Sequence, residues 1–314
     1  MKKIFIFILS VIIILSAFTA CTAPDETTDN GKINVVTTIF PVYDWTKNVA
    51  GENCNVIYLD ESGTDMHSFE PTAKNILAIT SADVFIHIGG VSDEWVENAL
   101  SASGNTSLIT LALADVTGMI EEEIIDGMEH DHESDHDSAE NDEHIWLSLK
   151  KAQKAVSAIA DSLANADTEN ADEYRLNAEN YNKKLSALDT EYTDCVNNAK
   201  RKTLLFADRF PFRYLTEDYG IEYFAAFPGC SAESEASFET MTFLIEKVRE
   251  LSLPCIITIE NSDSKIAGTI SNETDTKILS LNSCQSVTKS DIDNGITYIS
   301  AMENNLQILT EALN

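Results

Sequence analysis

The feature that most constrains this chain is an alternation of strand-like and helix-like segments that one long, purely helical stretch interrupts. Short runs rich in β-branched and aliphatic residues precede and follow that stretch, and segments with helical spacing separate them. These runs lie at residues 32–38, 55–59, 83–90 and 107–111, and then at 203–207, 222–226, 255–260 and 277–281. Strands separated by helices pair in parallel, so the sequence predicts two α/β lobes, each with a parallel sheet.

The interrupting stretch, residues 148–199, predicts two helices with a break near residues 165–170. In the second helix, apolar and aromatic residues recur three, four or seven positions apart and so share one side. They are Tyr174, Tyr181, Leu185, Leu188, Tyr192 and Val196. A helix of about 28 residues is roughly 40 Å long. We therefore expect a long, rigid connecting helix between an N-terminal lobe at 33–147 and a C-terminal lobe at 200–314.

The first 21 residues have the pattern of a secretion signal. Lys2 and Lys3 precede an apolar stretch that is too short for a comfortable membrane span, and small residues follow it. A cysteine directly after Thr-Ala makes the segment resemble a bacterial lipoprotein signal, in which Cys21 becomes the lipidated residue. An ordinary signal peptide that ends near a cysteine is the alternative. We expect residues 22–32 to be a flexible tether and the protein to lie outside the cytoplasm, anchored to the cell membrane.

The composition is strongly acidic, because 52 Asp and Glu against 21 Lys and Arg give a formal net charge of −31. So negative a surface argues against nucleic acids and anionic membrane surfaces as partners and is compatible with cations. Beyond Cys21 there are five cysteines, far apart and without a CxxC pair, so we expect them mainly to be small buried residues. The sequence leaves their pairing open.

Histidines gather in one acidic run. Residues 121–143 contain twelve carboxylates and no lysine or arginine, and His130, His132 and His136 lie among them. Such a segment cannot bury enough apolar surface to fold on its own. Imidazoles among flexible carboxylates make loose sites for a borderline cation such as zinc. The run is therefore predicted to be an accessory metal-gathering loop, with a solvated acidic loop as the alternative.

Two further histidines lie at the borders of predicted elements. His67 lies in a loop between a strand and a helix, and loops at the carboxyl ends of strands are where open α/β sheets bind ligands. His144, in Asp-Glu-His-Ile-Trp-Leu-Ser, lies where the acidic run meets a helix, and its aromatic and aliphatic neighbours would fix its imidazole. Each alone is a weak signal, because a lone histidine is more often a surface or core residue. His87, inside a strand, fits the core interpretation.

Together these features make the chain resemble the solute-binding lipoproteins of bacterial zinc and manganese ABC transporters. The matching stretches are residues 35–44, 66–72, 82–90, 142–148 and 214–221, so the likeness covers nearly all of the chain after the tether. The resemblance implies two α/β lobes linked by a rigid helix, with one metal in the cleft between them and His67 and His144 as ligands. It also implies a monomer that delivers its cargo to a membrane permease powered by an ATPase. A His-rich loop before the second histidine marks the zinc-handling members and favours Zn²⁺ over Mn²⁺.

The C-terminal half departs from that family pattern. The family places a third ligand, histidine or glutamate, between a strand and a helix that ends in Tyr-Gly, and counting here gives Arg209 or Ala207. Asp208 between them is the predicted substitute, and structural ion pairs of Asp208 and Arg209 are an equal alternative. A fourth, acidic ligand is predicted at Asp263, with Glu260 less favoured. Two histidines with one or two carboxylates suit zinc and tolerate manganese.

We expect a binding protein and not an enzyme. A zinc-dependent hydrolase, the alternative from another class, needs an open coordination position and a general base, and the sequence contains no HExxH, GxSxG or Walker motif. A manganese-binding member of the same transporter class is the nearer alternative. An adhesin-like surface protein is a third alternative, and adhesion would be a secondary role because the sequence has no separate module for it. Cys230, which follows a predicted strand, is left as a less favoured zinc ligand.

Overall fold

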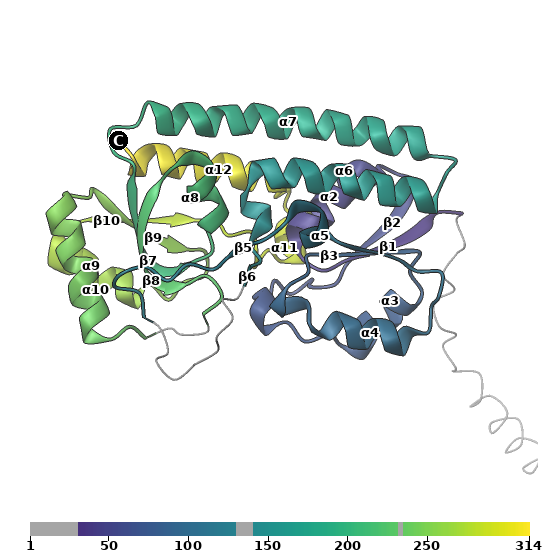
Figure 1. The fold of residues 1–314 in the computed structure, drawn as a ribbon, viewed down its shortest axis with the longest axis horizontal. Helices are drawn as coiled ribbons and strands as arrows, with labels where there is room; N and C mark the ends of the chain where they lie inside the picture. Colours follow the sequence, from purple (N-terminus) through teal and green to yellow (C-terminus); the bar gives the residue numbers. More distant parts are fainter. Residues whose placement is uncertain (1–30, 130–140, 232–234) are drawn as a thin grey trace, which may run out of the picture. The chain divides into compact units, whose positions relative to one another are not determined.

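Two parallel sheets carry the fold, as Figure 1 shows for a computed structural model that describes residues 31–129, 141–231 and 235–314. Within these residues the first sheet has the strand order β2-β1-β3-β4 and the second sheet the order β10-β9-β7-β8. All neighbouring strands in both sheets are parallel, so the predicted pair of parallel α/β sheets is confirmed. Below, each sheet with the helices that connect its strands is called the first or the second lobe.

The chain divides into a short unit at 1–32 and a large unit from Ile33 to Asn314. Residues 1–30 lie outside the described part of the chain, and with them the predicted signal, Cys21 and most of the tether. Among the helices that the structure describes, none has the length and apolar character needed to cross a bilayer.

In the first lobe, helices alternate with strands as the sequence predicts. Thr72 begins α3 with a capping box, in which its hydroxyl accepts from Asn75 N while the Asn75 side chain accepts from Thr72 N. Two short 3-10 helices, η2 (Met66–Ser68) and η3 (Val91–Asp93), interrupt the loops after β2 and β3. The other elements are β1 (Ile33–Thr37), α2 (Phe40–Ala50), β2 (Cys54–Tyr58), α3 (Ala73–Thr80), β3 (Val84–His87), α4 (Trp95–Ser103), β4 (Ile109–Ala112) and α5 (Leu113–Thr117).

The second lobe repeats the alternation with one irregularity. Its first strand runs on to Phe210, three residues beyond the predicted end, and its register against β8 shifts between Phe206 and Arg209. Such a bulge turns side chains away from the regular alternation of a strand. The elements are β7 (Thr203–Phe210), α8 (Arg213–Tyr219), β8 (Glu222–Pro228), α9 (Phe238–Leu251), β9 (Cys255–Ile259), α10 (Lys265–Thr274), β10 (Lys277–Leu281), α11 (Lys289–Asp293) and α12 (Tyr298–Ala312).

The predicted helical stretch forms α6 (Leu149–Ala166) and α7 (Ala171–Asn197). Ser148 caps the first of them, since its hydroxyl accepts from Lys151 N. The predicted long helix is present as α7, which has 27 residues. It packs against α2 and α6 at one end and against α12 at the other, so it spans both lobes (Figure 1).

One continuous core joins the two sheets. Successive strand residues face opposite sides of a sheet, and here Val35 and Leu204 belong to a shared cluster, whereas Val36 and Leu205 belong to separate clusters. The shared cluster also contains the buried residues of α2, α6, α7 and α12. Because one face of each sheet packs on the same helices, those helices fix the two lobes relative to each other.

The part of the acidic run that the structure describes does not stand free. Strand β5 (Ile120–Glu121) pairs antiparallel with β6 (Asn141–Asp142), and this pair spans the run. Glu129 N donates to the Ala226 carbonyl at 2.8 Å, and a Glu129 carboxylate oxygen accepts from Ser237 N at 2.7 Å. Both ends of the run are therefore held, and His130, His132 and His136 between them lie outside the described residues.

A buried carboxylate ties α2 to α7 and makes stability depend on pH. Asp44 is 8% exposed, and its Oδ2 accepts from the Tyr181 hydroxyl at 2.8 Å. Burial raises the pKa of Asp44 to about 6, although the Tyr181 hydrogen bond lowers it. A raised carboxyl pKa stabilises the fold below the unfolded value, and that contribution is lost as pH rises through about 6.

Asp44→Asn should therefore raise the free energy of unfolding at about pH 8 by about 1–3 kcal/mol, because the amide needs no proton to stay neutral. The gain should vanish near pH 4, where the aspartate is itself protonated. Denaturant unfolding at the two pH values measures the difference. A variant less stable than the parent at pH 8 would show that the charged carboxylate is the stabilising form.

Candidate metal centre

His144 is held from both sides by the segments around it. It follows β6 and precedes the 3-10 helix η4 (Ile145–Leu147), and its side chain is fully buried. Asp142 Oδ1 accepts from His144 N at 2.8 Å and lies 2.9 Å from His144 Nδ1. Trp146 Nε1 donates to the Ser283 carbonyl of the second lobe at 2.7 Å. A carboxylate on Nδ1 places the ring proton there and leaves the Nε2 lone pair for a ligand.

The surroundings of His144 act on its pKa in opposite directions. Burial lowers it, whereas the Asp142 carboxylate, with Glu143 and Glu122, raises it, and the net result is a raised pKa. A proton therefore competes for this imidazole more strongly than for an isolated histidine. The same carboxylates would also stabilise a metal ion bound at Nε2, because their negative charge attracts cations.

His67 approaches from the loop after β2. Asp65 caps η2, because its Oδ1 accepts from His67 N at 3.0 Å. His67 Nδ1 lies 2.9 Å from Ser92 Oγ and 3.2 Å from a carboxylate oxygen of Glu143, which is itself buried. Glu143 also accepts from Ser92 N and from Ser92 Oγ. Here too the hydrogen bonds occupy Nδ1 and leave Nε2 available.

The absence of a side chain at Gly90 makes room for the Glu143 carboxylate. Gly90 has φ +104°, a backbone conformation that side chains rarely adopt. A Cβ at this position would lie 2.6 Å from Glu143 Oε2, which is too close for any real contact. Only glycine at residue 90 therefore allows the carboxylate to reach Ser92 and His67.

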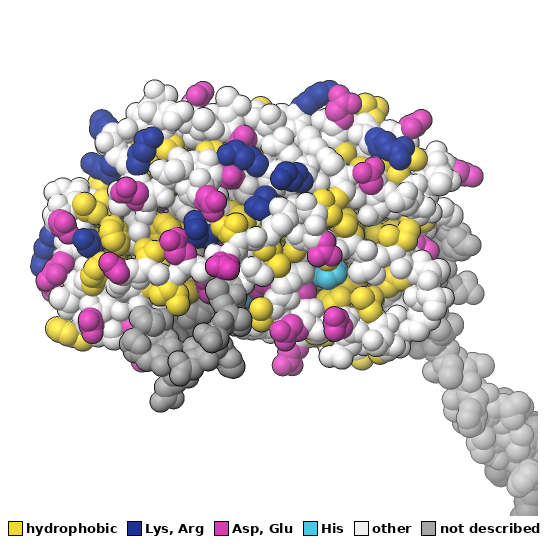
Figure 2. Space-filling view, viewed as in Figure 1, with side chains coloured by type: hydrophobic (Ala, Val, Ile, Leu, Met, Phe, Trp, Pro, Cys, Tyr) yellow, Lys and Arg dark blue, Asp and Glu magenta, His cyan; other side chains and the backbone are white. Residues whose placement is uncertain are grey.

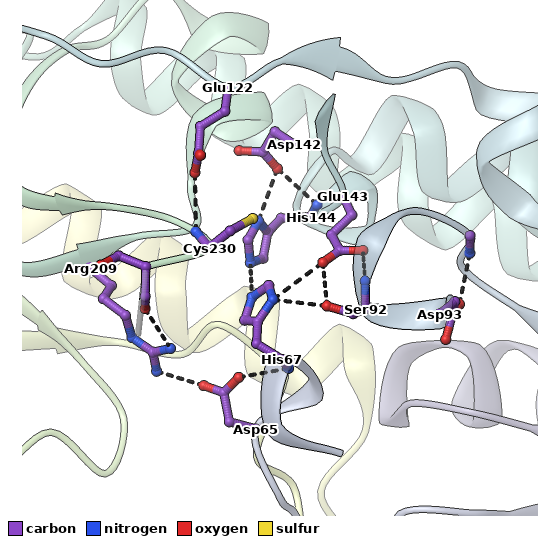
Figure 3. A network of polar contacts seen from close by, with 12 residues as sticks. Asp65, His67, Ser92, Asp93, Glu122, Asp142, Glu143, His144, Arg209 and Cys230 are labelled. Carbon is purple, nitrogen blue, oxygen red and sulfur yellow. Dashed lines mark hydrogen bonds and ion pairs between the residues drawn. The ribbon is translucent and has the colours of Figure 1, made fainter. Parts of the chain in front are cut away.

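The two imidazoles meet at their unoccupied nitrogens, with 3.3 Å between His67 Nε2 and His144 Nε2 (Figure 3). A tetrahedral zinc ion with Zn–N bonds of about 2.0–2.1 Å separates two nitrogen ligands by about 3.3 Å. The geometry of the pair therefore fits two neighbouring ligands of one such ion.

The Cys230 thiol lies beside the two imidazoles and forms with them a group of three possible metal ligands. Cys230 follows β8, and its Sγ, the His67 ring and the His144 ring each offer one ligand atom, all within 4.8 Å of one another. Cys230 N donates to a Glu122 carboxylate oxygen at 3.1 Å. At Gly229 a Cβ would lie 2.8 Å from the Phe210 carbonyl oxygen and 3.2 Å from His144 Cε1, so glycine allows this loop to approach the imidazole.

Burial and three nearby carboxylates act in the same direction on Cys230. Burial raises the pKa of its thiol most, and Glu122, Asp142 and Glu143 raise it further. The thiol is therefore protonated without a metal, and a cation that binds Sγ must displace that proton. Four of the cysteines beyond Cys21, namely Cys195, Cys230, Cys255 and Cys284, are free thiols.

A cavity of about 460 Å³ lies between the lobes. Asp65 and Ser68 of the first lobe line it together with Asp208, Arg209 and Asp263 of the second lobe. Arg209 Nη2 and Asp65 Oδ2, 2.6 Å apart, form an ion pair across it. Burial would raise the pKa of Asp65, but Arg209 and His67 outweigh it, and the pKa is lowered. Arg209, one of the two residues that counting places at the family's third ligand position, therefore forms an ion pair between the lobes.

The two predicted carboxylate ligands line this cavity, but neither belongs to the group around His144. Asp208 Oδ1 accepts from Arg209 N at 2.9 Å, and its Oδ2 lies 3.5 Å from Ile259 N. Asp263 is exposed and forms an ion pair of 2.7 Å with Lys265 Nζ. Their roles as ligands stay predictions.

The remaining candidates also have partners. Glu260 accepts from Ser283 N and Ser283 Oγ, both at 2.6 Å, at the end of β9. His87 lies buried in β3, with its Nδ1 3.1 Å from Asp93 Oδ2, and does not belong to the group. Sequence reasoning did not single out Ser92 and Glu143, although Glu143 directly precedes a predicted ligand.

Known proteins to which this chain is similar are described as zinc-binding or zinc-uptake proteins. Residues 35–312 match the family model described as zinc-uptake complex component A, periplasmic. The chain is 34% identical over 312 residues to the zinc-binding lipoprotein AdcA of Streptococcus pneumoniae, covering 99% of this chain but 61% of that protein. It is 30% identical over 287 residues to the high-affinity zinc uptake system protein ZnuA of Bacillus subtilis, covering 90% of this chain and 88% of that one.

A solved structure supports the same relation. The Zn(II)-bound ZnuA-like domain of S. pneumoniae AdcA superimposes with a TM-score of 0.73 at 32% identity, covering 90% of this chain and 99% of that domain. This chain therefore spans about the ZnuA-like part of its streptococcal relative and less than two thirds of the whole relative.

Proposed function

This chain belongs to the family of zinc-uptake complex component A, and from that premise we propose that it captures Zn²⁺ outside the cytoplasm and delivers it to an ABC-type importer. The observation that carries the proposal is the pair of oriented imidazoles, that of His144 fully buried and that of His67 half-buried, whose Nε2 atoms lie 3.3 Å apart. His67 and His144 hold the cargo from the first lobe. Asp142 and Glu143 fix the two rings through Nδ1, and such outer partners raise the basicity of a metal-binding histidine.

The partners of this function are a membrane permease and its ATPase, and the protein acts as a monomer held to the cell membrane by lipid on Cys21. The names of two relatives, a zinc-binding lipoprotein and a high-affinity zinc uptake system protein, support zinc uptake and a lipid anchor. The charge distribution is compatible with a cationic cargo, since in Figure 2 Lys and Arg lie over the upper and middle parts of the face, and among the charged side chains that the structure describes, those nearest its lower edge are Asp and Glu.

We propose no catalytic role. A hydrolytic zinc site needs a general base free to accept a proton from bound water. The carboxylate that contacts the His67 ring, that of Glu143, already accepts from Ser92 N and Ser92 Oγ. Ester or peptide turnover that is lost in His67→Ala would contradict this assignment.

Zinc competition with a chromophoric chelator tests the proposed function. The protein should begin after Cys21, because the hydrophobic clusters formed by the described residues lie within the unit from Ile33 to Asn314. We expect one tight site that does not depend on residues 130–140. Absence of any tight site would remove the basis for zinc capture.

The acidic loop should affect how zinc arrives and not how tightly it is held. Replacing residues 130–140 with a short Gly-Ser linker keeps the anchor at Glu129 and the β5–β6 pair. We expect slower zinc uptake by cells at scarce zinc and fewer weak sites, because the imidazoles that raise the local zinc concentration are gone. Radioactive zinc uptake and equilibrium dialysis measure the two effects.

A matched control keeps the length and charge of the loop but replaces His130, His132 and His136 with asparagine. It should behave like the deletion if the imidazoles gather zinc, and like the parent if the carboxylates alone do so. Loss of the tight site in either variant would contradict the separation of gathering from binding.

A further inference from the structure

The second lobe contributes one soft ligand atom to the group at His67 and His144. We propose that Cys230 Sγ is the third metal ligand, so that two imidazoles and one thiolate hold the cargo and select zinc and other thiophilic cations against manganese. This inference rests on the proposed function of the site and names a ligand and a specificity for it.

The ligand atoms of His67, His144 and Cys230 lie close together. The ligand atoms of the three residues lie within 4.8 Å of one another, and Figure 3 shows Cys230 beside the His144 ring. A tetrahedral zinc ion with Zn–S of about 2.3 Å and Zn–N of about 2.0–2.1 Å places sulfur about 3.5 Å from nitrogen. A small inward movement of the Cys230 side chain therefore brings its sulfur to bonding distance of an ion held by the two imidazoles.

The loop that carries Cys230 is held in place from three directions. Cys230 N donates to Glu122, and Gly229 packs against the Phe210 carbonyl and the His144 ring. Strand β8 before the loop is fixed by its pairing with β7. The thiol is therefore positioned by the fold, as a ligand must be.

Competing donors from the second lobe have other partners. Asp208 accepts from Arg209 N, and Asp263 is paired with Lys265 at the surface. Glu260 is bound by Ser283. Among the described residues, the group within metal-binding reach of both histidines contains Cys230 and no second-lobe carboxylate. A tetrahedral metal site has a fourth ligand, and Asp208 and Asp263 remain candidates for it.

The donor set determines the selectivity. Thiolates bind zinc, monovalent copper and similar soft or borderline cations, whereas manganese prefers carboxylate, carbonyl and water oxygens. Two imidazoles and two carboxylates, the set predicted from sequence, would tolerate manganese. Replacement of one carboxylate by sulfur therefore narrows the cargo to zinc-like ions.

Cobalt substitution tests the ligand directly, because Co²⁺ bound to a thiolate shows an intense sulfur-to-metal charge-transfer absorption that nitrogen and oxygen ligands do not produce. The protein beginning after Cys21 is compared with Cys230→Ser, and with Cys195→Ser as the matched control. Cys195 is also half-buried, and it lies in α7 with its Sγ 3.3 Å from Thr310 Oγ1. Thermal unfolding without metal establishes that each variant is folded.

We expect the charge-transfer band in the parent and in Cys195→Ser, and its loss in Cys230→Ser. Zinc affinity should fall in Cys230→Ser by more than the roughly 10–100-fold that loss of an outer partner costs. Cys230→Asp should bring the zinc and manganese affinities closer together. A cobalt complex that lacks the band, or a band that persists in Cys230→Ser, would overturn the inference. Should His67→Ala leave binding intact, it is the proposed function that fails, and not only this ligand.

Discussion

Replacing His144 with alanine should lower the affinity for zinc by more than about 100-fold, because loss even of an outer partner of a metal-bound histidine costs roughly 10–100-fold. His144 is fully buried and its ring is fixed by Asp142, so its Nε2 is a ligand position that the fold itself sets. His67→Ala should have a comparable effect, since the two Nε2 atoms face each other. Competition with a chelator of known affinity measures the change.

His87→Ala is the matched control for this loss. His87 is also buried and also has a carboxylate on Nδ1, that of Asp93, but it does not belong to the ligand group. Both alanine variants leave a cavity, and unfolding measurements without metal should show similar losses of stability. Zinc affinity should fall only in His144→Ala. Equal affinities in the two variants would place the zinc elsewhere.

Zinc affinity should also fall steeply between about pH 7.5 and about pH 5.5, because zinc binds the neutral imidazole. Burial lowers the pKa of His144, but Asp142, Glu143 and Glu122 outweigh it, and the pKa is raised. Protons therefore begin to compete at a higher pH than at an isolated histidine. Below that pKa the affinity drops about tenfold per pH unit for each proton that zinc must displace.

The variant Asp142→Asn distinguishes proton competition at His144 from unfolding of the protein in acid. The amide can hold the ring but carries no charge, so the pKa of His144 should fall and the loss of affinity should begin at a lower pH. Affinity at neutral pH should fall by about 10–100-fold. Titrations of both proteins across the range, with unfolding followed in parallel, measure the shift. An unchanged affinity between pH 7.5 and 5.5 in the parent would contradict a site built on histidines.

The sequence predicted those parts of the fold that follow from periodicity. Strand and helix alternation predicted both sheets, and the spacing of Tyr174, Tyr181 and Tyr192 predicted α7, because apolar side chains on one side of a helix must be buried. His67 and His144 were identified as candidates because each lies where an element begins or ends. The distance of 3.3 Å between their Nε2 atoms results from tertiary packing, which no local sequence pattern predicts.

The metal ligands of the second lobe could not be predicted in the same way. Counting along β7 assumes a regular strand, but the register shift between Phe206 and Arg209 changes which side chains face the cavity. Arg209 pairs with Asp65, and Asp208 accepts from backbone nitrogens. Cys230 was a less favoured ligand in the sequence because only the packing of Gly229 against His144 brings it to the site.

The measurement that tests the central claim most directly is a crystal structure of the zinc-loaded protein, with the metal located by anomalous scattering at the zinc edge. We expect one dominant peak between the lobes, about 2.0–2.1 Å from His67 Nε2 and from His144 Nε2 and about 2.3 Å from Cys230 Sγ. A dominant peak bound without His67 and His144 would contradict the claim that this cleft carries zinc.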